Sequence, residues 1–197
     1  AMEDDMSGDL GLADGEVHAE AQEVLDFWFG ELTPKQHFAK DDAVDTMIAS
    51  RFARLHDILM ASGAAGWRDT PECLLAAVIV LDQFSRNMHR GSAQAYAADT
   101  LALSLTLEAI GKHWDEGLPP ERAAFLYLPL MHAEHPEAQR LSLRKFTALG
   151  QPENLRFAME HAVVIEQFGR FPSRNAALGR ASTAEELDYL KRPDAGW

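Results

Sequence analysis

The chain has 197 residues, a length that suits one domain with a full hydrophobic core. Its net charge of -13 arises mainly from residues 1–34, which hold ten acidic residues and no lysine or arginine, so the rest balances 21 acidic against 18 basic residues. Nucleic acid is not an expected partner, because phosphate binding needs a clustered basic face and the sequence has no dense Lys/Arg run.

Membrane association is not expected either. The longest apolar run, residues 73–81, is nine residues long, whereas a membrane-spanning helix needs about 20. The acidic start of the chain has the wrong charge for a secretory signal. These features predict a cytoplasmic protein.

Residues 1–16 place glycines among acidic residues without an apolar period, which predicts a disordered acidic tail. Residues 17–197 should then form a single helical domain. Apolar positions that recur at spacings of three and four predict its first helix over residues 17–29, with Gly30 in the usual place of a C-cap.

The next helix is expected from Asp41 or Asp42, as a capping residue, to about Met60. Proline suits the first helical position and an adjacent acid favours the positive end of the helix dipole. Four further helix starts carry this signature, at Pro71, Pro120, Pro136 and Pro152.

Two more helices complete the prediction. One should span residues 92–112, and the last begins at Ser182 or Thr183, where Glu185 or Glu186 can form a capping box. Pro129 should kink or end its helix just before residues 132–134. The β-branched residues 78–80 sit in a segment long enough for a buried helix. The fold class is therefore all-α, with about eight antiparallel helices.

One motif occurs twice. Residues 80–87 and 164–170 both end an apolar run with an acid, then Gln-Phe, then an arginine four residues after the acid. The pairs Asp82 with Arg86 and Glu166 with Arg170 have the favourable spacing for helical ion pairs. Both motifs lead into polar loops, so we expect them to be two halves of one site.

Three stretches of the sequence resemble motifs of a known protein family. They are Leu81-Asp82-Gln83-Phe84-Ser85-Arg86-Asn87, Leu128-Pro129-Leu130-Met131-His132-Ala133-Glu134 and Phe168-Gly169-Arg170-Phe171-Pro172-Ser173-Arg174-Asn175. From about residue 23 to 190, the chain resembles bacterial proteins of the family known as domain of unknown function 924. The resemblance implies a tetratricopeptide-like helical array, and it implies no reaction. Where that family usually has proline and histidine, this chain has Ser85 and Ser173, so a mechanism that needs an imidazole at position 173 is not expected.

The arginines of the two loops outnumber the two acids, and Asn87 and Asn175 directly follow Arg86 and Arg174. A guanidinium fork beside an amide suits a carboxylate or phosphate. The predicted ligand-binding residues are Asp82, Gln83, Arg86, Asn87, Arg170, Arg174 and Asn175. The alternative is structural, in which each arginine neutralises an acid at a helix end and holds the following loop.

Three further residues could supply acid and base chemistry, because imidazole titrates near neutrality and a carboxylate can tune it. These candidate catalytic residues are His132, Glu134 and His161. Their spacing matches no short zinc-ligand pattern, so no metal is predicted, and no nucleotide-binding glycine loop points to a cofactor.

The sequence therefore favours a helical domain that binds a small anionic molecule or a peptide carboxylate. One alternative is a metal-independent enzyme that uses a His/Glu acid-base pair. A second is a protein-protein interaction scaffold whose polar motifs are structural. Whether a reaction is catalysed and which oligomeric state forms are left open.

Overall fold

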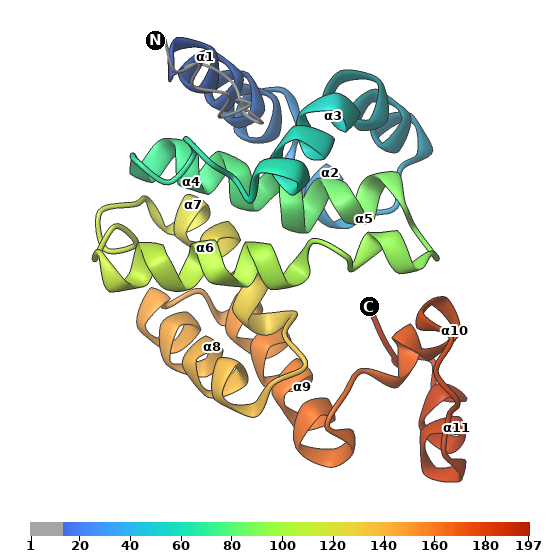
Figure 1. Ribbon diagram of the computed structural model, residues 1–197. Helices are drawn as coiled ribbons and strands as arrows, with labels where there is room; N and C mark the ends of the chain where they lie inside the picture. Colours follow the sequence, from blue (N-terminus) through green and yellow to red (C-terminus); the bar gives the residue numbers. More distant parts are fainter. Residues whose placement is uncertain (1–13) are drawn as a thin grey trace, which may run out of the picture.

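The computed structural model describes residues 14–197, which form helices and loops and contain no strand (Figure 1). The all-α prediction is confirmed, and the expected number of about eight helices is close. The α-helices are α1 (Asp14–Leu25), α2 (Pro34–Phe38), α3 (Asp42–Ser62), α4 (Pro71–Val78), α5 (Ser85–Met88), α6 (Asp99–Gly111), α7 (Pro120–Met131), α8 (Pro136–Leu149), α9 (Pro152–Phe168), α10 (Asn175–Leu178) and α11 (Ala184–Leu190). Two π-helical segments, η1 (Asp26–Glu31) and η2 (Ile79–Phe84), and two 3-10 turns, η3 (Ala93–Ala95) and η4 (Pro172–Arg174), complete the described chain.

Local sequence signals set most helix starts. Helices α4, α7, α8 and α9 each begin at the predicted proline. The Asp41 side chain caps α3 by accepting two backbone N–H groups, and Thr183 and Glu186 form the predicted capping box of α11. Helix α7 ends at Met131, two residues after Pro129, which agrees with the expected end of that helix before residue 132.

The first helix differs from its prediction at both ends. Helix α1 already begins at Asp14, so residues 14–16 of the expected disordered tail are helical, while residues 1–13 lie outside the described part. Gly30 is not a C-cap, because the helix continues through it as η1, which ends at Glu31 with Leu32 as the C-cap. The wider π turn lets Phe27 and Trp28 both enter the core.

Helix α4 and its continuation η2 form the centre of the molecule. Every residue from Leu74 to Leu81 is buried, which confirms the buried helix predicted for residues 78–80. Figure 1 shows α1 and α3 on one side of this central segment, and α6, α8 and α9 on the other. Helices α1, α3, α6 and α7 all contact it.

Helices α7, α8 and α9 pack in succession below that centre. The chain then leaves α9 for a separate small cluster, in which Val164, Ile165, Phe171 and Tyr189 pack the end of α9 against α11. This arrangement is a helical array, whereas kinship with tetratricopeptide repeats stays a prediction. No helix within residues 14–197 combines the length and apolar character that crossing a membrane requires.

Candidate functional site

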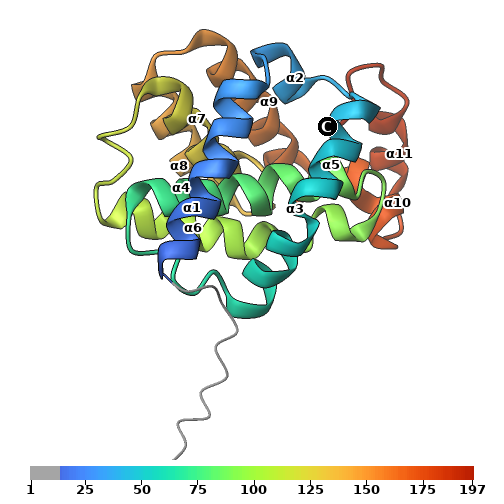
Figure 2. The ribbon, with the colours of Figure 1, turned by 90° about the horizontal axis from the view of Figure 1, so that it is seen from above.

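A cavity of about 320 Å³ lies where the central segment, α7, α9 and the C-terminal segment meet. Segments far apart in the sequence supply its walls, including His37 and Phe38 from α2. Figure 2 shows the arrangement of these helices from above. The lining residues are His37, Phe38, Gln83, Arg86, Asn87, Arg90, Tyr96, Leu128, Met131, His132, Asn154, Phe157, His161, Phe171, Ser173, Arg174 and Trp197.

Asp82 lies behind the cavity lining, next to the lining residues Gln83 and His132, on the π-helical segment η2, with 1% of its surface exposed. Its carboxylate lies 2.7 Å from Nδ1 of His132 and accepts a 2.7 Å hydrogen bond from Nε2 of Gln83. Burial alone would raise the pKa of the Asp82 carboxyl, but His132 and Arg86 outweigh it and hold this pKa below its ordinary range. Asp82 is therefore ionised.

His132 follows the end of α7 and presents its ring to the cavity. Burial lowers the pKa of this imidazole in spite of Asp82, so the ring is neutral near pH 7. An ionised carboxylate only accepts hydrogen bonds, so Nδ1 carries the proton and Nε2 keeps a free lone pair. Within residues 14–197, Nε2 has no hydrogen-bond partner. The result is a proton acceptor that faces the cavity.

Arg86 is fully engaged with carboxylates. Its two terminal nitrogens donate to Asp99 at 2.7 and 2.9 Å, and Nη1 also donates to the Asp82 backbone carbonyl at 2.9 Å. The predicted pair with the Asp82 side chain is present at 3.4 Å. Burial would lower the pKa of Arg86, but the charges of Asp82 and Asp99 raise it.

Arg174 is the least satisfied arginine in the site. It is 7% exposed, and its one hydrogen bond to a described residue runs from Nη2 to the His132 carbonyl at 3.0 Å. Its Nη1 lies 3.6 Å from Asp99, too far for a hydrogen bond. The guanidinium carbon lies 4.6 Å from the ring centre of Tyr96 and 4.5 Å from that of Phe171. Burial and the neighbouring Arg86 lower the pKa of Arg174.

His161 reaches the same cavity from α9. Its Nδ1 lies 2.7 Å from the Phe157 carbonyl, so Nδ1 donates to that oxygen. Burial, reinforced by His132, lowers the pKa of His161 to about 3, which keeps this ring neutral. The ring stacks on Trp197 with centres 3.6 Å apart, and its centre lies 6.0 Å from that of His132. The two predicted histidines thus belong to one site.

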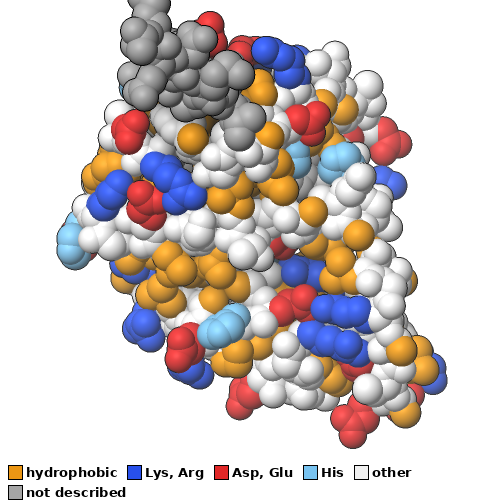
Figure 3. All heavy atoms as spheres, viewed as in Figure 1, with side chains coloured by type: hydrophobic (Ala, Val, Ile, Leu, Met, Phe, Trp, Pro, Cys, Tyr) orange, Lys and Arg blue, Asp and Glu red, His pale blue; other side chains and the backbone are white. Residues whose placement is uncertain are grey.

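The remaining predicted residues form a second network that braces the chain after α9. Glu134 accepts two hydrogen bonds from Arg180 and one from the backbone N–H of Phe171. Arg170 pairs through two nitrogens with Glu186, to which Asn175 also donates. Figure 3 shows basic and acidic side chains gathered on the face between α9 and α10.

The structure thus divides the predicted site residues. Those that meet at the cavity are Asp82, Gln83, Arg86, Asn87, His132, His161 and Arg174. Asn87 lines the cavity but donates its amide to Asp45 at 2.8 Å. Glu134, Arg170 and Asn175 belong to the second network, so the two motifs do not form symmetric halves. The expected Glu166–Arg170 pair is not formed, because Glu166 is exposed and Arg170 turns to Glu186.

Several site residues carry no signal in the sequence. Asp99 looks like an ordinary acid in the first turn of α6, yet it lies between the guanidinium groups of Arg86 and Arg174. Tyr96 and Trp197 come from loops without a motif. Within the described part of the chain, no three His, Cys, Asp or Glu side chains gather in a way that could hold a metal ion.

Comparison with known proteins assigns the chain to a family. The family model for a bacterial protein of unknown function (DUF924) matches residues 24–194. The chain belongs to this family. A solved neighbour, the protein of unknown function ATU0120 from Agrobacterium tumefaciens, is 38% identical, with a TM-score of 0.85, and the match covers 89% of this chain and 98% of that one. No curated protein matched significantly.

Proposed function

We propose that this DUF924 protein binds a small organic anion in the cavity, with Arg174 as the main contact. The observation that carries the proposal is the state of Arg174, a buried guanidinium whose Nε and Nη1 have no hydrogen-bond partner within residues 14–197. Neither nitrogen is sealed inside the protein, so both donors are open to the cavity that Arg174 lines. A carboxylate or phosphate could bind along one edge of this guanidinium, pairing Nη2 with either Nε or Nη1.

The surroundings of Arg174 support this role. The Tyr96 and Phe171 rings hold the guanidinium in one plane, so little side-chain freedom would be lost on binding. Arg86 lies close enough to lower the pKa of Arg174, but Asp82 and Asp99 already compensate the charge of Arg86, so a bound anion would depend mainly on Arg174. Enclosure by protein strengthens these charge interactions, because the effective dielectric constant is lower than in water.

Arg170 and Arg180 show what a purely structural arginine looks like in this protein, and Arg174 differs from both. Both of these arginines donate two or more hydrogen bonds to carboxylates and a further one to a backbone carbonyl. An interaction scaffold whose polar groups are only structural would treat Arg174 in the same way. The unpaired donors of Arg174 favour ligand binding over the scaffold alternative.

The test is calorimetric titration with acetate, benzoate and inorganic phosphate against the parent, Arg174→Ala and Arg174→Lys. Charge-assisted hydrogen bonds contribute about 1.5–3 kcal/mol, so the alanine variant should lose about 10- to 100-fold in affinity. Arg174→Lys keeps the charge but not the fork, and should bind with intermediate affinity. Arg144→Ala removes an exposed arginine of α8 and serves as the matched control. If the parent binds none of these anions, the proposal is wrong.

One observation favours a second candidate, an enzyme with acid-base chemistry. His132 has its Nδ1 fixed by Asp82 and its Nε2 free toward the cavity, which is the arrangement of a general base. In this candidate Asp82 takes the place of Glu134 as the partner of the imidazole. It is tested by the pH dependence of any turnover found for a bound anion, which should fall as His132 is protonated and vanish in His132→Gln.

A further inference from the structure

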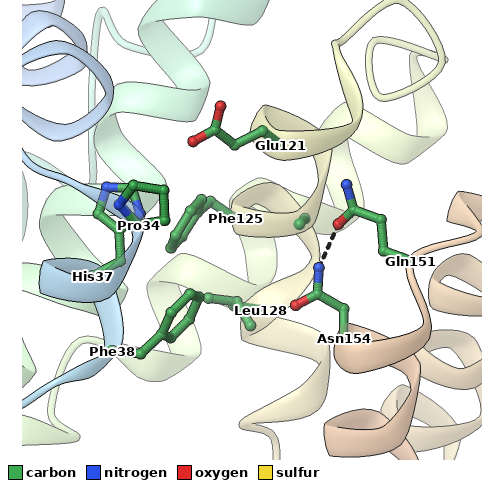
Figure 4. A pocket seen from close by; sticks show the side chains of 9 residues that line it. Pro34, His37, Phe38, Glu121, Phe125, Leu128, Gln151 and Asn154 are labelled. Carbon is green, nitrogen blue, oxygen red and sulfur yellow. Dashed lines mark hydrogen bonds between the residues drawn. The ribbon is translucent and has the colours of Figure 1, made fainter.

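A smaller pocket of about 110 Å³ opens beside the cavity, between α2, α7 and the start of α9 (Figure 4). Four residues line both hollows: His37, Phe38, Leu128 and Asn154. The two hollows therefore adjoin across these four side chains, with Arg174 in the larger one.

Aromatic rings form one side of the side pocket, and the amides of Gln151 and Asn154 lie on the other. Phe38 stacks on Phe125 with ring centres 5.8 Å apart and planes 13° apart, and Figure 4 shows the two rings side by side. The ring centres of His37 and Phe125 lie 5.0 Å apart with their planes nearly perpendicular. Nε2 of His37 is hydrogen-bonded to the Trp28 carbonyl. Such a wall contacts apolar groups and offers few hydrogen bonds.

Phe38 is unusual because 68% of its surface is exposed although it sits at this junction. Leaving a large aromatic side chain in water forgoes the stabilisation that burial would provide. An apolar group placed between Phe38 and Leu128 would cover that surface. The exposed ring thus suits a ligand with an apolar portion.

Glu121 marks the outer end of the side pocket, one turn before Phe125 on α7. Its carboxylate forms no hydrogen bond or ion pair with the residues of the described chain. The charge at the outer end therefore opposes the charge at the inner end, where Arg174 lies. A ligand with a second negative group at its far end would be repelled.

These observations extend the proposed anion site. We propose that its ligand is an amphiphilic monoanion, whose carboxylate binds Arg174 and whose aliphatic or aryl tail fills the side pocket between Phe38, Phe125 and Leu128. The inference rests on the proposed function, and it adds a tail pocket that selects for chain length and against a second anionic end.

The first experiment measures the affinity of straight-chain carboxylates from acetate to octanoate by calorimetry. Each methylene that enters the side pocket should lower the Kd about two- to fourfold, until the pocket is full. Phe38→Ala should flatten this dependence for the longer acids, so that octanoate loses more affinity than acetate does. Leu187→Ala removes another exposed apolar side chain, on α11, and should behave as the parent.

A second arm compares octanoate with the dicarboxylate of equal length. The dicarboxylate should bind at least about tenfold more weakly, and Glu121→Gln should narrow that difference without changing the affinity for octanoate. A length-independent Kd, or a slope that Phe38→Ala leaves intact, overturns the tail pocket. If Arg174→Ala loses affinity while the chain length of the ligand has no effect, the anion site is supported and the tail pocket is not. If no carboxylate binds the parent, both proposals fail together.

Discussion

Asp82 and His132, 50 residues apart in the sequence, are joined by a 2.7 Å hydrogen bond in the cavity wall. The carboxylate comes from a π-helical turn and the imidazole from the residue after α7. Because the carboxylate can only accept, this bond decides which nitrogen of His132 carries the proton. The chemistry that the cavity offers therefore depends on a single buried charge.

Replacing this charge should change the tautomer of His132. In Asp82→Asn the amide can donate to Nδ1, so the proton should move to Nε2 and the free acceptor in the cavity should disappear. The variant should also lose about 2 kcal/mol of unfolding free energy, because Arg86 and Gln83 lose a buried charged partner. Nitrogen chemical shifts of His132 report the tautomer, and urea titration reports the stability. An unchanged tautomer would contradict the assignment.

His161 should make the fold sensitive to mild acid. Its folded-state pKa of about 3 lies below the ordinary value of 6.5. Between these two values the unfolded chain binds the extra proton, so the stability contribution is present above about pH 6.5 and is lost as the pH falls toward 3. For one such group the slope approaches about 1.4 kcal/mol per pH unit.

The measurement is urea unfolding at pH 7, 6 and 5 for the parent and His161→Gln. The unfolding free energy of the variant should depend less steeply on pH, since the variant lacks the group that takes up a proton on unfolding. His113→Gln, which changes an exposed histidine in the loop before α7, is the matched control and should keep the parental slope. Equal slopes in the parent and His161→Gln would refute the prediction.

Glu134 should affect stability and leave binding unchanged. It holds Arg180 and the backbone of Phe171 but does not line the cavity. Glu134→Gln should therefore lower the unfolding free energy by about 1–3 kcal/mol, and the folded variant should bind acetate with parental affinity. Glu137→Gln, at an exposed position of α8, is the control. If Glu134→Gln lost affinity for acetate without losing stability, Glu134 would have to be counted among the ligand-binding residues.

Local signals made much of the fold predictable. A proline at the first helical position, and the capping box of Thr183 and Glu186, involve only residues within one helical turn. The local sequence is therefore enough to predict where these helices begin. The π turn at residues 79–84 was not predicted. Its hydrogen-bond pattern reflects packing of the central segment against α3, α6 and α7, which no local window contains.

The site was predictable in part for the same reason. The Asp82–Arg86 pair follows from helical spacing, and it is present. Arg170 has the same local context, yet it pairs with Glu186 because α11 folds back beside it. The sequence shows which arginines are near an acid, but the tertiary fold decides which of them keeps donors free. Asp99 was missed because its partners lie 13 and 75 residues away.

The π turn of η2 also limits how the chain length can vary. A π turn holds one residue more than the α-helical turn it replaces, and each residue of an α-helix advances by about 100° around the axis. A chain that lacked one residue between Ile79 and Phe84 could keep α4 buried. It would nevertheless turn Arg86 by that angle relative to α4 and the helices that pack against α4, and so away from its place in the cavity. A one-residue deletion here would therefore erase the site while sparing the core, although no side chain that contacts a ligand had been replaced.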